Sequence, residues 1–134
     1  MQNYRLEIEY DGTRYYGWEH QPNVDTIQGK LENVLAEMCS IKAENIELNG
    51  AGRTDAGVHA RDMTANVRLN TDKSPVEIRD YLNRYLPEDI AVMSVENAGE
   101  RFHARYNALG KTYRYSIYDG KVKPVFGRRF YTAL

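Results

Sequence analysis

Hydrophobic and polar residues alternate in several segments of the chain, and each such segment predicts a strand. The clearest is YRLEIEY at residues 4–10, in which every second residue is apolar or aromatic. Strict alternation of this kind is typical of a strand that is buried on one side only. The residues on the predicted inner side are Tyr4, Leu6, Ile8 and Tyr10. By the same reasoning, we predict strands at 4–10, 46–48, 63–69, 89–95 and 111–118.

Two other segments repeat apolar residues at intervals of three and four, which predicts helices. The first follows Asp25 and Gln28, whose spacing resembles a capping box, and ends near Cys39. The second begins at SPVE, residues 74–77, with a serine cap, a proline at the first helical position and a glutamate at the third. The predicted apolar positions are Ile27, Leu31, Val34, Leu35 and Met38 in the first helix, and Ile78, Leu82 and Tyr85 in the second.

The predicted elements follow the order strand, helix, strand, strand, helix, strand. This is the order of the split βαβ unit of ferredoxin-like and RRM-like folds, in which two helices cover one face of a four-stranded antiparallel sheet. We therefore predict an α+β fold, with residues 1–134 as a single domain. The second face of such a sheet must be covered by another segment or must bind something.

Length and composition are those of an ordinary globular domain, with 134 residues, 42% hydrophobic and 28% charged. The single cysteine, Cys39, cannot form a disulfide within the chain. The amino terminus carries no apolar signal segment, and no run of about 18 apolar residues could span a bilayer. We therefore expect a soluble, cytoplasmic protein that does not associate with membranes.

The net charge of −1 conceals an uneven distribution along the chain. Residues 101–134 carry a net charge of +7, and residues 1–100 carry −8. The basic segment also holds eight of the fifteen aromatic residues. Cations that contact phosphates, interleaved with rings that stack on bases, are typical of nucleic-acid surfaces. A strand whose inner face contributes aromatic residues to the core and whose outer face is basic would explain the same pattern. Two hypotheses therefore remain for the aromatic residues: burial in the core, or binding of RNA or DNA.

The connection between the second and third predicted strands reads GAGRTDAGVHA at residues 50–60. It is longer than the roughly two to five residues of a plain hairpin, and its Gly52 and Gly57 bracket Arg53 and Asp55. In a locally extended segment these two charged side chains project to the same side and can pair. Such a pair would keep the Asp55 carboxylate ionised, which suits a nucleophile or an electrostatic stabiliser. From the residues alone, an ion-paired turn without chemistry is an equal alternative.

Other site chemistries find little support in the sequence. His20, His59 and His103 are isolated from one another and from Cys39, without the spacing of metal-binding motifs. The glycine-rich stretch misses the dinucleotide-binding fingerprint and lacks the lysine of a phosphate loop. We therefore expect no metal site.

Several motifs of the chain resemble those of one enzyme family. In chain order they read EYDGTRYYGW, GRTDAGVHA, LPEDIAV, FHARYNA and KTYRY. Together they resemble the TruA family of tRNA pseudouridine synthases over nearly the whole chain. The resemblance implies an isomerase that converts uridine to pseudouridine in the anticodon stem-loop of tRNA, without a metal or an organic cofactor. It also implies one half of a pseudouridine synthase fold, because family members resemble two such units that share one extended sheet.

Candidate site residues follow from this resemblance by position. Asp55 matches the catalytic nucleophile, on a catalytic loop at 49–61. Arg53 matches an arginine that pairs with this aspartate and helps to hold the target nucleotide out of its stack. Tyr113 matches the tyrosine that stacks on the target uracil. Further candidates for RNA binding are Arg105, Lys111, Arg114 and His59.

Two features depart from the family's pattern. Asp62 and Met63 stand where the family commonly has Gly-Gln, so we expect a polar contact near the site to be lost or replaced. The chain also supplies only the amino-terminal unit of the two. We therefore expect these 134 residues by themselves to be inactive or weakly active, and the full-length protein to be a homodimer that binds tRNA. A noncatalytic RRM-like RNA-binding module is the alternative function that the same features allow.

Overall fold

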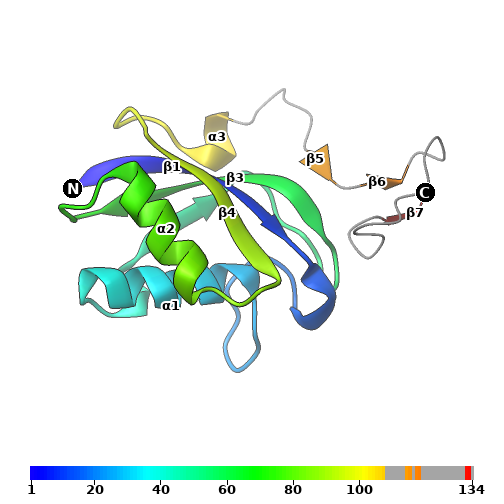
Figure 1. Cartoon of the computed structure of the whole chain (residues 1–134). Coiled ribbons are helices and arrows are strands. Elements are labelled where there is room, and N and C mark those ends of the chain that lie inside the picture. Colours follow the sequence, from blue (N-terminus) through cyan, green and yellow to red (C-terminus); the bar gives the residue numbers. More distant parts are fainter. Residues whose placement is uncertain (108–113, 116, 119–131, 134) are drawn as a thin grey trace.

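Four antiparallel strands form the larger part of the five-stranded main sheet of the computed structural model (Figure 1). The structure describes residues 1–107, 114–115, 117–118 and 132–133. The strands are β1 (Gln2–Tyr10), β2 (Glu47–Gly50), β3 (Ala60–Leu69) and β4 (Ile90–Asn97). Their order is β2-β3-β1-β4, so β1 and β3 are central. The antiparallel sheet predicted from the alternating pattern is therefore confirmed.

Two helices, α1 (Ile27–Cys39) and α2 (Pro75–Tyr85), lie side by side on one face of this sheet (Figure 1). The predicted start of α2 is confirmed in detail. The Ser74 hydroxyl accepts a hydrogen bond from the Glu77 amide, and the Glu77 carboxylate accepts one from the Ser74 amide. This reciprocal capping box satisfies two backbone donors that the first turn of a helix leaves unpaired.

Two details of the helices differ from the prediction. Helix α1 is capped by Thr26 and not by Asp25, because the Thr26 hydroxyl accepts a hydrogen bond from the Gly29 amide at 3.1 Å. Tyr85, predicted to lie in the apolar stripe of α2, is 53% exposed. The next residue, Leu86, is buried in its place, because the helix ends there and the chain turns back toward the sheet.

The hydrophobic core lies between the two helices and the sheet. All four predicted inner residues of β1 are at most 2% exposed. Burying an aliphatic or aromatic side chain of this size contributes roughly 1.5–3 kcal/mol, so this layer fixes the helices against the sheet. The largest fully buried aliphatic side chains are Leu6, Ile8, Ile27, Leu31, Leu35, Leu69, Ile78 and Leu82.

The structure also refines the predicted strands. Strand β2 is displaced toward the glycine-rich connection, since it covers Glu47–Gly50 and not 46–48. The predicted strand 111–118 lies partly outside the described residues. Within it, β5 (Arg114–Tyr115) pairs with β3, and β6 (Ile117–Tyr118) pairs with β7 (Thr132–Ala133). Among the helices of the described parts, none is long and apolar enough to cross a membrane.

Two buried asparagines bind the segment that follows β4. Asn3 and Asn66 occupy the face of the sheet opposite the helices, because their neighbours in the alternation belong to the core. The Asn3 side-chain amide donates to the carbonyl oxygens of Gly99 and Phe102, at 2.9 and 2.8 Å. Asn66 donates to Asn3 at 3.1 Å and accepts from the Ala104 amide at 2.9 Å. The two side chains thereby attach residues 99–104 to the centre of the sheet.

A short helix, α3 (Ala104–Asn107), begins where this asparagine network ends. It contacts β2 and β3 and lies away from α1 and α2 (Figure 1). The described part of the chain therefore covers some of the second face of the sheet with α3, which carries the candidate residue Arg105.

Replacing Asn66 by alanine tests whether this network holds α3 in place. The substitution leaves the Ala104 amide and the Asn3 side-chain oxygen without a bond to residue 66. We therefore expect the free energy of unfolding to fall by about 1–3 kcal/mol and the Ala104 amide to lose protection from hydrogen exchange.

Asn83→Ala is the matched control, because Asn83 also makes two side-chain hydrogen bonds, both to the backbone of Val92. This variant should lose stability but keep the protection of the Ala104 amide. Equal exchange at Ala104 in the two variants would contradict the assigned role of Asn66.

Candidate active site

The Asp55 loop, residues 51–59, connects the end of β2 to the start of β3. Strand β1 pairs with β3 along the length of β3, from Leu69 to Ala60. Strands β2 and β5 therefore share the other side of β3, with β2 at 65–68 and β5 at 60–62. The Asp55 loop leaves the sheet between these two strands. At this position Ala51 and Thr54 of the loop are buried, whereas Arg53 and Asp55 are exposed to solvent.

Asp55 is the first residue of a tight turn within this loop. The Val58 amide donates to the Asp55 carbonyl oxygen at 3.1 Å, and Gly57 has a φ of +79°, a value that favours glycine. Thr54, directly before the turn, is 6% exposed, and its hydroxyl shares a 2.8 Å hydrogen bond with the Tyr10 hydroxyl. The Asp55 side chain itself is exposed. The turn thus presents a carboxylate to solvent from a backbone that is fixed by its buried neighbour.

A second segment, the aromatic loop at residues 15–18, lies directly against the Asp55 loop. The two backbone hydrogen bonds between them, each 3.1 Å long, run from the Trp18 amide to the Thr54 carbonyl and from the Gly57 amide to the Tyr15 carbonyl. Gly17 lies between the two bonds, with a φ of +92°. A Cβ atom at this position would lie 2.5 Å from the Thr54 carbonyl oxygen. Glycine at residue 17 is therefore what allows the two backbones to approach each other.

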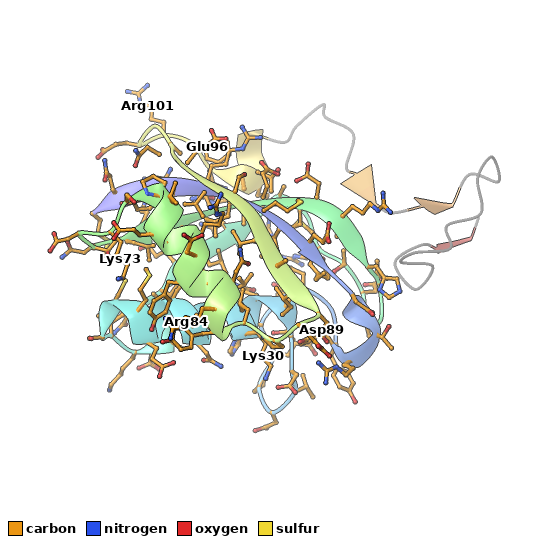
Figure 2. All side chains as sticks on the ribbon, viewed as in Figure 1. Lys30, Lys73, Arg84, Asp89, Glu96 and Arg101 are labelled. Atoms are coloured by element: carbon orange, nitrogen blue, oxygen red, sulfur yellow. The ribbon has the colours of Figure 1, made fainter. Side chains whose placement is uncertain are left out.

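Buried aromatic side chains anchor both ends of the aromatic loop. Trp18 is 3% exposed and lies so close to Gly50 that a Cβ there would come within 2.7 Å of the indole ring. Its ring centroid is 6.3 Å from that of Tyr10. Tyr15 donates its hydroxyl to Asp89, labelled in Figure 2, at 2.6 Å. Burial and the nearby Asp89 carboxylate raise the pKa of Tyr15, so this hydroxyl stays a donor.

His59 lies at the end of the Asp55 loop and joins it to the segment after β1. Its Nδ1 accepts a hydrogen bond from the Gly12 amide at 2.8 Å and lies 3.2 Å from a carboxylate oxygen of Asp11. The His59 side chain is only 11% exposed. Its observed contacts are structural, and RNA binding by His59 stays a prediction.

Arg53 lies between two neighbouring pockets. One pocket, of about 350 Å³, is lined by Arg53 and Asp55 together with Tyr16. The other, of about 200 Å³, is lined by Arg53 and by Arg105 of α3. The structure therefore brings three of the predicted site residues to adjoining pockets, although Arg105 is distant from the other two in sequence.

The ion pair seen at Arg53 has a partner that the sequence did not indicate. Its Nη2 atom lies 3.5 Å from a carboxylate oxygen of Glu19, which follows the aromatic loop. Both side chains are more than half exposed, so the pair orients the guanidinium more than it stabilises the fold. The pairing of Arg53 with Asp55 stays a prediction.

The remaining predicted residues are described only in part. Tyr113 and Lys111 lie outside the described residues. Arg114 lies in β5, and its backbone pairs with that of Asp62 in β3. That strand lies on the side of β3 from which the Asp55 loop emerges. Tyr16, Glu19 and Gln21 also line the Asp55 pocket, and of these only Tyr16 belongs to a motif quoted above, EYDGTRYYGW, without being assigned to a site. The feature that could have found them is the concentration of glycine, proline and aromatic residues at 13–22.

Asp62, which departs from the family's pattern, lies beside Glu7 of β1. Burial and a hydrogen bond with Asp62 raise the pKa of the Glu7 carboxyl group, and hydrogen bonds from Thr64 and Arg5 partly offset this shift. The Thr64 hydroxyl donates to Glu7 at 2.9 Å. The departure at residue 62 therefore places a second carboxyl group beside that of Glu7.

The arrangement around Asp55 suits chemistry that needs a positioned carboxylate. An exposed carboxylate on a fixed backbone can attack an electrophilic carbon, accept a proton or stabilise positive charge. A guanidinium in the wall of the same pocket can hold an anionic or polar ligand. Across the described ranges of the chain, no three or more His, Cys, Asp or Glu side chains are grouped to hold a metal ion.

Comparison with known proteins points to one kind of enzyme. A family model described as tRNA pseudouridine synthase matches residues 7–107. The chain is 50% identical over 131 residues to tRNA pseudouridine synthase A of Bacillus sp. strain KSM-64. These 131 residues are 97% of this chain and 52% of that protein. It is 45% identical to tRNA pseudouridine synthase A 2 of Bacillus cereus and 47% identical to tRNA pseudouridine synthase A 1 of Clostridium tetani, with the same coverage. The chain thus spans about half the length of the curated relatives it matches.

Replacing Gly17 by alanine tests whether the close approach of the two loops supports the fold. The new Cβ would meet the Thr54 carbonyl and impose a left-handed conformation on a residue that rarely adopts it. We expect the free energy of unfolding to fall by about 1–3 kcal/mol in urea denaturation.

Gly99→Ala is the control, because a Cβ there meets nothing within 4 Å. Its stability should stay within about 0.5 kcal/mol of the wild type. Gly57→Ala separates the two causes, since it has a positive φ in open space and should show an intermediate loss. A Gly17→Ala variant as stable as Gly99→Ala would contradict the importance of the contact.

Proposed function

Because the chain belongs to the tRNA pseudouridine synthase family, we propose that Asp55 is the catalytic nucleophile of a site that isomerises uridine to pseudouridine in tRNA. The observation that carries this proposal is the presentation of Asp55. Its carboxylate is exposed in a pocket, while its backbone is fixed on both sides by hydrogen bonds to the aromatic loop. A nucleophile needs this combination of access and fixed position.

The proposed reaction moves uracil on its ribose without adding or removing atoms overall. The N-glycosidic bond breaks, the detached base turns, and C5 of uracil joins the ribose; C5 then loses its proton, and N1, freed from the ribose, gains one. Asp55 either attacks the base, attacks the sugar carbon, or accepts a ribose proton to form a glycal. Each role requires contact between the carboxylate and the nucleotide, and an exposed side chain at a pocket allows that contact.

The same pockets suggest how the nucleotide is held. A uridine in a stem must be extruded from its stack before Asp55 can reach it, at a cost of a few kcal/mol. We assign Arg53 to holding the extruded nucleotide and Tyr113 to stacking on its base, as the family resemblance implies. Arg105 shares a pocket with Arg53 and is suited to contact phosphate, and Lys111 and Arg114 extend the same basic segment.

The fold and length of the chain support a further part of the proposal. The strand order β2-β3-β1-β4, with two helices on one face, fits a ferredoxin-like unit. The chain covers 52% of the relatives' length, which fits one of two such units in a larger enzyme. We propose that the complete protein acts in the cytoplasm as a homodimer, on the anticodon stem-loop of tRNA.

Substitution of Asp55 by asparagine tests the proposed nucleophile. The assay uses the longest product of the gene that encodes this chain, with tRNA that carries tritium at C5 of uridine. We expect the wild type to release tritium, and Asp55→Asn to lower the rate by at least about 10³-fold while tRNA affinity changes little. The amide has nearly the shape of the carboxylate but lacks its nucleophilicity.

Asp80→Asn provides the control, because Asp80 is an exposed carboxylate on α2, in an ion pair with Arg79. It should release tritium at the wild-type rate. If the protein is a noncatalytic RNA-binding module, it should bind tRNA while neither the wild type nor any variant releases tritium. If Asp55→Asn releases tritium at the wild-type rate, Asp55 is not the nucleophile.

A further inference from the structure

The aromatic loop contains one ring that is turned outward. Tyr16 is 56% exposed, whereas Tyr15 before it and Trp18 after it are 5% and 3% exposed. The two buried rings anchor the loop in the core, so the outward position of Tyr16 belongs to a fixed segment. An exposed tyrosine offers a flat face for stacking at a small cost in side-chain entropy.

The backbone of Tyr16 is held from several directions. Its amide donates to the Asp25 carbonyl at 2.8 Å, and its carbonyl accepts from the Gln21 side-chain amide at 2.7 Å. The bonds that join the aromatic loop to Thr54 and Gly57 lie on either side of it. Tyr16 is therefore positioned opposite the turn that begins at Asp55.

The pocket between Tyr16 and Asp55 has the composition of a nucleobase site. It has a volume of about 350 Å³ and combines the Tyr16 ring with one guanidinium, two carboxylates and one amide, from Arg53, Asp55, Glu19 and Gln21. A nucleobase presents an apolar face and a polar edge, so a ring together with hydrogen-bonding groups matches both.

We propose that Tyr16 is a stacking platform for the tRNA base next to the uridine that Asp55 acts on. The inference rests on the proposed function and extends it to a second nucleotide. Extruding one nucleotide removes a stacking partner from its neighbours. A fixed ring beside the carboxylate replaces that partner and holds the distorted strand while Asp55 acts.

A coupling experiment between protein and RNA tests this role. The probe is an anticodon stem-loop RNA, with dissociation constants measured by fluorescence anisotropy at one fixed salt concentration. Tyr16→Ala should weaken binding by about 5- to 150-fold, the range expected for loss of one aromatic–base stack. Tyr16→Phe should bind within about twofold of the wild type, because stacking needs the ring and not the hydroxyl.

Tyr85→Ala is the matched protein control, since Tyr85 is exposed to a similar extent, 53%, but lies on α2. It should bind RNA as the wild type does. Three further RNAs carry an abasic residue at the target uridine, at its 5′ neighbour or at its 3′ neighbour. With one of the two neighbour-abasic RNAs, Tyr16→Ala should cause less than about a twofold loss, because the stack is already absent.

The outcomes separate this inference from the proposed function. If the wild type releases tritium from tRNA but Tyr16→Ala binds as tightly as Tyr85→Ala, the stacking role of Tyr16 is wrong and the proposed function stands. The assignment to a neighbouring base is also wrong if only the abasic residue at the target uridine abolishes the effect of Tyr16→Ala on binding. It is likewise wrong if Tyr16→Ala weakens binding equally for all four RNAs. If the wild type neither binds nor modifies the RNA, the proposed function fails and the inference fails with it.

Discussion

The candidate site depends on one close contact between two backbones, that of the aromatic loop and that of the Asp55 loop. Gly17 makes the contact possible, because a side chain there would collide with the Thr54 carbonyl. The two hydrogen bonds beside Gly17 then fix Thr54 and Gly57, and therefore the Asp55 that lies between them. Without this contact, the Asp55 loop would be a long exposed connection whose carboxylate had no defined position.

Packing in the core holds the two loops of the site in place. Trp18 and Tyr10 are both buried, and the Tyr10 hydroxyl reaches Thr54, so the end of β1 supports both loops at once. On the opposite face of the sheet, the asparagine network fixes α3 and so places Arg105 at the pocket of Arg53. Exposed side chains, including Asp55 and Tyr16, are thereby displayed from a backbone that is held by hydrogen bonds on both sides of each residue. This division is common in enzymes, whose functional loops rest on a rigid scaffold.

The hydrophobic pattern predicted the sheet and both helices, because an element with one buried face has apolar residues at regular intervals. The interval is two residues in a strand and three or four residues in a helix. The pattern could not choose between Thr26 and Asp25 as the cap of α1, since both residue types cap well and the choice depends on which hydroxyl or carboxylate reaches Gly29. The motif resemblance indicated Asp55 and Arg53 as candidate site residues, and their roles stay predictions. It did not indicate the contact between Arg53 and Glu19, or the exposure of Tyr16 between two buried rings, because both depend on how distant segments pack.

Hydrogen exchange of individual amides in the ligand-free protein tests the central claim most directly. If the aromatic loop fixes the Asp55 loop, the amides of Trp18 and Gly57 should exchange slowly, with protection approaching that of the amides in β1 and β3. The amide of Gly99, at an exposed turn, sets the rate for comparison. Exchange of Trp18 and Gly57 as fast as Gly99 would show that the two loops separate freely and would contradict a preorganised Asp55.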